Sequence, residues 1–70
     1  MKAPETWNGK VLYYDETFRS RPYPTEAEAQ WKLDRIREFH NPERGWRELS
    51  ATIERTEEGY VVVRHHALYR

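Results

Sequence analysis

The sequence contains no cysteine, so it offers no disulfide, no thiolate nucleophile and no zinc–thiolate site. That composition suits a reducing compartment. No run of apolar residues reaches the length that a signal peptide or a membrane span requires. We therefore expect a cytoplasmic protein without a membrane partner.

The chain also has few glycines and no formal net charge. Glycine occurs only at positions 9, 45 and 59, so the chain has no glycine-rich loop that could hold a phosphate. Lys plus Arg and Asp plus Glu each number 12, which gives a formal net charge of zero. No field of the whole molecule attracts it to nucleic acid or to acidic membranes.

Residue types that carry catalysis or bind metals are present but poorly arranged. His65 and His66 are neighbours on a predicted strand and must point to opposite sides, while His40 stands at the end of a predicted helix. Ser20 and Ser50 lack the local signature of a catalytic nucleophile. We predict no catalytic residues, no metal and no cofactor, and hence no enzyme.

Residues 25–40 carry the clearest structural signal, that of a helix. Thr25 and Glu28 have the spacing of a capping box, and Asn41-Pro42 ends the segment because a residue before proline avoids helical angles. The apolar stripe of this helix consists of Ala29, Leu33, Ile36 and His40, with Phe39 at its edge. One stripe predicts one partner layer.

The other segments have the composition of strands. Asn8-Gly9 is a turn signal, and residues 11–14 and 17–19 are rich in β-branched and aromatic residues. Asp15-Glu16 between them is either part of one long strand or the tip of a hairpin, and we favour the turn. Residues 49–54 alternate apolar and polar side chains, and residues 60–69 form the last strand.

The register of the last two strands decides which side chains face the core. A three-residue loop over 57–59 sets Ile53 opposite Val63 and makes one face apolar, whereas a two-residue loop would set Ile53 against Arg64. We predict the longer loop. It also sets Ala51 opposite His65 and Leu49 opposite Ala67, with His65 in the core. The solvent-facing side would then carry Trp46, Arg64, His66 and Arg70.

These elements predict an α+β fold, in which an antiparallel sheet of three or four strands carries one helix on one face in the order β(β)αββ. We expect a single domain over residues 1–70, of which residues 1–6 form a loose N-terminal arm.

Trp31 does not fit this two-layer plan, because it lies about 140° from the centre of the apolar stripe, near Arg35. Either the N-terminal arm covers it through Trp7 or Tyr23, or it is exposed and contacts a partner. Both interpretations stay open at this point.

The sequence predicts the function only as a broad class. We predict a small protein-binding module, a monomer or weak homodimer, that occupies the surface of another protein. The residues expected at this contact are Trp31, Arg35, Trp46, Arg64, His66 and Arg70. In size and layout alone it is similar to small phage-encoded inhibitors such as anti-CRISPR proteins, and no motif supports that likeness.

Two alternatives use the same residues. An arginine-rich and aromatic face of the sheet could bind nucleic acid by stacking, with contributions from Arg19, Arg21, Tyr23 and Tyr69. A small toxin-like RNase could use the His, Arg and Tyr residues of the last strand. The neutral net charge disfavours both.

Overall fold

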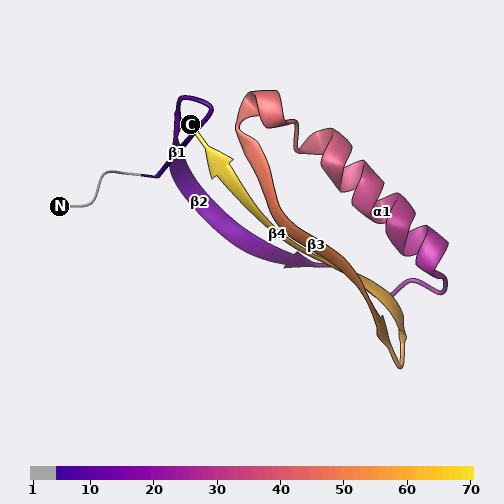
Figure 1. The fold of residues 1–70 in the computed structure, drawn as a ribbon. Helices are drawn as coiled ribbons and strands as arrows, with labels where there is room; N and C mark the ends of the chain where they lie inside the picture. The colour runs from indigo at the N-terminus through magenta and orange to yellow at the C-terminus, as the bar shows by residue number, and fades with distance from the viewer. Residues whose placement is uncertain (1–4) are drawn as a thin grey trace.

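A computed structural model describes residues 5–70 and shows one helix lying along one face of a four-stranded antiparallel sheet (Figure 1). The elements in chain order are β1 (Thr6–Trp7), β2 (Lys10–Arg19), α1 (Glu26–Phe39), the 3-10 turn η1 (Pro42–Arg44), β3 (Trp46–Thr56) and β4 (Gly59–Tyr69). The strands are ordered β1-β2-β4-β3, so β4 is central. The predicted α+β class is confirmed.

Helix α1 begins and ends where the local sequence predicts. The Thr25 hydroxyl accepts a hydrogen bond from the Glu28 amide at 3.2 Å, and the His40 amide donates to the Ile36 carbonyl at 2.9 Å. Ala29 and Leu33 are buried and pack with Val62 of β4 in the core between helix and sheet.

Strand β2 is continuous, so the turn favoured at Asp15-Glu16 is wrong. Its pairing with β4 is irregular between Leu12 and Tyr14, and this bulge shifts the alternation by one residue. Beyond the bulge, Glu16 and Phe18 lie on the helix side. Glu16 is stable there because its carboxylate accepts a hydrogen bond from His66 Nε2 at 2.9 Å.

The β3–β4 hairpin has a two-residue loop, Glu57-Glu58, so the predicted register is wrong. Thr56 pairs with Gly59, which sets Ile53 opposite Val62, a register that differs from both of those considered from the sequence. The reason is a close crossing: Tyr23 pairs with Tyr60, and a Cβ at position 59 would overlap the Tyr23 carbonyl. Gly59 is thus required inside the ladder (φ 138°) and does not belong to the loop.

The changed register reverses the predicted faces of β4. His66 and Arg64 lie on the helix side and are 1% and 2% exposed, whereas His65 is on the other side, where its Nε2 lies 3.0 Å from an Asp15 carboxylate oxygen. A second bulge between Glu48 and Ser50 also turns Leu49 out of the predicted alternation.

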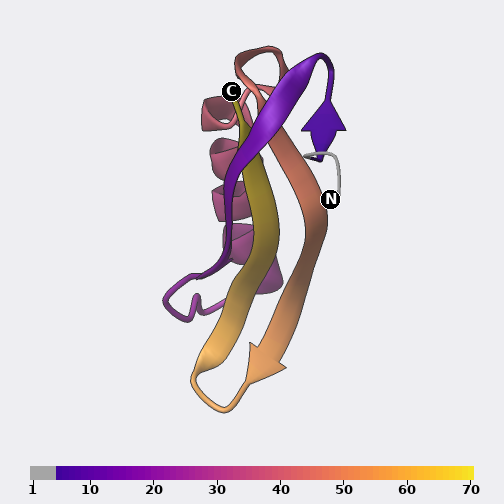
Figure 2. The ribbon, with the colours of Figure 1, turned by 90° about the vertical axis from the view of Figure 1, so that its left-hand side faces the viewer.

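Strand β1 folds over the open face of the sheet, away from the helix (Figure 2). Asn8 and Gly9 have φ angles of 52° and 75° and form the predicted tight turn of the β1–β2 hairpin. The Trp7 ring lies 5.5 Å from the Tyr69 ring, and Tyr69 donates a hydrogen bond to Glu5 at 2.9 Å. Of the expected loose arm, residues 1–4 lie outside the described residues, and Thr6 belongs to β1.

Candidate protein-binding surface

Trp31 is 60% exposed on the helix. The interpretation that Trp7 covers it is wrong, because Trp7 lies on the opposite face of the sheet against Tyr69. Arg35, one turn further along α1, places its guanidinium carbon 5.7 Å from the centre of the Trp31 ring. This cation–π contact holds two of the predicted partner-binding residues together.

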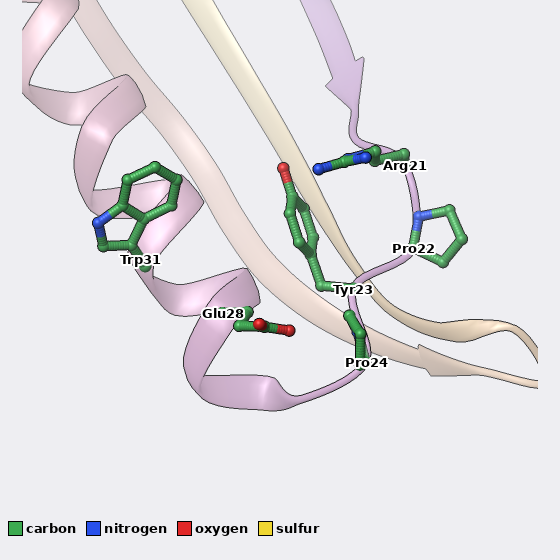
Figure 3. A pocket seen from close by; sticks show the side chains of 6 residues that line it. All are labelled: Arg21, Pro22, Tyr23, Pro24, Glu28 and Trp31. Carbon is green, nitrogen blue, oxygen red and sulfur yellow. The ribbon is translucent and has the colours of Figure 1, made fainter.

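A hollow of about 510 Å³ separates Trp31 from the segment that leads into the helix (Figure 3). Arg21 lies over the Tyr23 ring on the far side, with 5.3 Å between its guanidinium carbon and the ring centre. The lining consists of Arg21, Pro22, Tyr23, Pro24, Glu28 and Trp31. We call these residues, with Arg35, the Trp31 surface.

A second hollow of about 330 Å³ lies further along the same side of the helix, between α1 and β2. It is lined by Glu16, Phe18, Lys32, Ile36, Phe39, His40 and His66, and we call it the Phe39 groove. Phe39 is 74% exposed, although a side chain of this size normally contributes to a core. Two large exposed aromatic residues therefore stand on one small helix.

Charge on this side of the helix is only partly neutralised. Arg35 pairs with Glu38 at 3.4 Å. Among residues 5–70, Arg21 and Lys32 have no carboxylate within ion-pair distance. The two hollows thus combine apolar rings with unpaired cations.

Three predicted partner-binding residues come together, but in a different place from the one predicted. Trp46, Arg64 and His66 lie beneath the C-terminal end of α1. The Trp46 ring stacks on His40 with 3.9 Å between centres and 9° between planes, and His66 lies 5.6 Å from Trp46. Since Arg64 and His66 are buried, they belong to the packing of the fold and not to its outer surface.

Arg64 is held by two acceptors. Its Nε donates to Glu48 Oε1 at 2.9 Å, and its Nη1 donates to His40 Nδ1 at 2.7 Å. Arg37 of the helix donates twice to the same Glu48 carboxylate, at 2.9 and 3.1 Å. We call Arg37, His40, Glu48 and Arg64 the Arg64 cluster. It ties the end of α1 to β3 and β4.

The electrostatics of this cluster favour a charged Glu48 and a neutral His40. The hydrogen bond from Arg37 lowers the pKa of Glu48, and the hydrogen bond from Arg64 lowers it less strongly. The bond between Arg37 and Glu48 also raises the pKa of Arg37. Burial lowers the pKa of His40, and the neighbouring His66 and Arg64 lower it further. A neutral His40 leaves Nδ1 free to accept from Arg64.

Arg70 lies apart from the other predicted residues. It follows the C-terminal end of β4, where its backbone pairs with Val11, and its guanidinium carbon lies 4.3 Å from the centre of the Tyr13 ring. The Trp31 surface includes Tyr23, whose backbone pairs with Tyr60 at the opposite end of β4. The structure therefore brings Arg35 to Trp31 but not Arg70.

Sequence reasoning missed the part that Phe18, Lys32 and Phe39 play in a common groove. On a helical wheel Lys32 and Phe39 lie about 20° apart, at the flank of the apolar stripe, which is a detectable signal. The contribution of Phe18 depends on the bulge in β2, for which the sequence has no clear marker.

Within residues 5–70, no group of three or more His, Asp or Glu side chains is placed to hold a metal ion. The same part of the chain has no helix of sufficient length and apolarity to cross a bilayer. No protein-family model matches the chain, and no curated protein or solved structure shows significant similarity to it.

Proposed function

We propose that this protein is a non-enzymatic protein-binding module that contacts its partner through the Trp31 surface and the adjoining Phe39 groove. The observation that carries the proposal is the 60% exposure of Trp31 in a chain with few residues available for a core. Fully burying a large apolar side chain is worth about 1.5–3 kcal/mol, and Trp31 and Phe39, at 60% and 74% exposure, leave most of that free energy available for an interface.

The composition of the surface supports a protein partner. Tryptophan, tyrosine and arginine are the residues that interfaces favour, and Trp31, Tyr23, Arg21 and Arg35 stand together here. Nucleic acid is less well matched. Three of the residues expected to stack or to contact phosphates, Arg64, His66 and Tyr69, are buried at 2%, 1% and 1% exposure.

The proposal is tested by affinity capture from lysate of the source cells with three forms of the chain. Trp31→Ala should abolish capture of a protein that the parent retains, because the anchor of the contact is lost. Tyr13→Ala is the matched control, since Tyr13 is also 60% exposed but lies on β2 near the C-terminus of β4. It should retain capture. Both variants should keep the thermal stability of the parent to within a few degrees.

Equal capture by the parent and Trp31→Ala would contradict the proposal. A change of tryptophan fluorescence on titration with single-stranded oligonucleotides, weakened at higher salt, would favour the nucleic-acid alternative.

A further inference from the structure

We infer that the partner contributes an extended segment, which adds as a new strand to the free edge of β2 along Asp15–Arg19 and places a large apolar side chain in the Phe39 groove. This inference rests on the proposed function and names the form of the partner. A carboxylate of the same segment would lie beside Lys32.

The edge of β2 is open for most of its length. Among residues 5–70, β1 pairs only with Lys10 and Val11, so no strand lies beside Tyr14–Arg19 on that side. The Ser20 amide donates to Val62, and in an antiparallel ladder hydrogen-bonded residues alternate. The N–H and C=O groups of Asp15, Thr17 and Arg19 consequently point outward, away from β4.

A strand added at this edge would deliver its side chains to the groove. Residues placed opposite Glu16 and Phe18 lie on the helix side, as Glu16 and Phe18 do, because paired residues share a face of the sheet. The groove there is apolar at Phe18, Ile36 and Phe39. Main-chain bonds along a strand edge combined with a pocket for alternate side chains define peptide recognition by strand addition.

The opposite edge of the sheet differs from this one. On that side a hollow of about 270 Å³ is lined by Arg37, His40, Pro42, Trp46, Glu48 and Arg64. There, Arg37 of the helix is joined to Glu48 of β3 by two hydrogen bonds. On the β2 side, no ion pair among residues 5–70 joins α1 to β2. This difference between the two edges of the sheet indicates that β2, and not β3, pairs with the added strand.

Charge argues for a foreign segment over a second copy of this chain. Lys32 lies in the groove without an acidic partner among the described residues. The one carboxylate in the lining of the groove, that of Glu16, is already hydrogen-bonded to His66. A two-fold dimer presents the same patch from both sides, so it would offer the groove a second lysine. A segment with an apolar residue and a nearby Asp or Glu complements it.

The test uses a phage-displayed library of random dodecapeptides selected on the full chain. We expect enriched peptides to carry apolar residues at alternate positions with a nearby acid. Binding should slow amide exchange at Asp15, Thr17 and Arg19. Thr17→Pro, which removes one outward donor and leaves the β4 ladder intact, should weaken binding about tenfold. Arg55→Pro is the matched control, since its N–H points outward from the β3 edge, and it should bind like the parent.

A second measurement does not depend on the folding of a variant. N-methylation of successive peptide bonds in a selected peptide should weaken binding at every other position, because only alternate N–H groups of an added strand face β2. A peptide affinity that N-methylation leaves unchanged at every position would overturn the inference, as would failure to select any peptide. Exchange protection of the β2 edge that rises with concentration of the chain alone would show that a second copy occupies it.

Failure of this inference is distinguishable from failure of the proposed function. Peptides whose binding is lost in Trp31→Ala but unchanged in Thr17→Pro would refute strand addition and leave the Trp31 surface as the contact. Equal capture of a protein from lysate by the parent and by Trp31→Ala would refute the proposed function itself.

Discussion

Replacing Glu48 by glutamine tests how far the fold depends on the Arg64 cluster. The substitution preserves the size of the side chain but removes the negative charge that faces two arginines. Arg64 is the sensitive one, because its side chain is 2% exposed and its Nε lies 2.9 Å from Glu48 Oε1. After the substitution its charge stays buried without a counter-charge.

The expected loss of unfolding free energy in Glu48→Gln follows from the burial of the ion pair. Removing one partner of a fully buried ion pair costs about 3–5 kcal/mol. The Glu48 side chain is 31% exposed, and the amide of glutamine still offers one acceptor, so we expect about 2–3 kcal/mol. A domain of this size has a free energy of unfolding of about 4–10 kcal/mol. The midpoint of thermal unfolding should fall by about 10–20 °C.

The matched control lies on the same strand. Glu54 pairs with Arg19 at 3.0 Å, but the two side chains are 50% and 56% exposed, so Glu54→Gln should cost less than about 1 kcal/mol. Urea unfolding followed by circular dichroism measures both variants. Equal costs for the two substitutions would show that the burial of Arg64 does not set the loss of stability. Adding Arg64→Met to Glu48→Gln should recover part of the loss, since it removes the uncompensated charge.

Two further predictions concern the pH and the backbone. Because the folded-state pKa of His40 is lowered, the unfolded chain binds its proton first, so the free energy of unfolding should fall as the pH is lowered through about 6.5. In His40→Asn this slope should disappear from urea titrations between about pH 7.5 and 5.5, and an unchanged slope would contradict the assignment. Gly45→Ala should lower the thermal midpoint by about 10 °C or more, because its Cβ would overlap the Tyr69 carbonyl. Gly9→Ala meets no atom within 4 Å and should cost only about 1 kcal/mol, so similar losses for the two alanines would be the contrary result.

Part of the candidate surface could be predicted from the sequence. The position of Trp31 opposite the apolar stripe is a consequence of helical geometry, and its exposure follows when one sheet covers one face of the helix. Phe39 at the flank of the stripe was visible in the same way. The groove between Phe39 and Phe18 was not, because it needs β2 to pass beside the helix in a particular register.

Local interactions within the amino-acid sequence were enough to predict the helix that Thr25 caps, the Asn8-Gly9 turn, and an α+β class with strands before and after the helix along the chain. Each depends on interactions between residues close in the chain.

The face of β4 that meets the helix depends on tertiary contacts. Both faces of that strand carry apolar side chains, so hydrophobic alternation cannot select between them, and two bulges shift the alternation of its neighbours. The choice rests on contacts between distant residues. Tyr23 crosses Gly59, Glu16 accepts from His66, and Glu48 neutralises Arg64, which together allow the polar face to pack beneath the helix end.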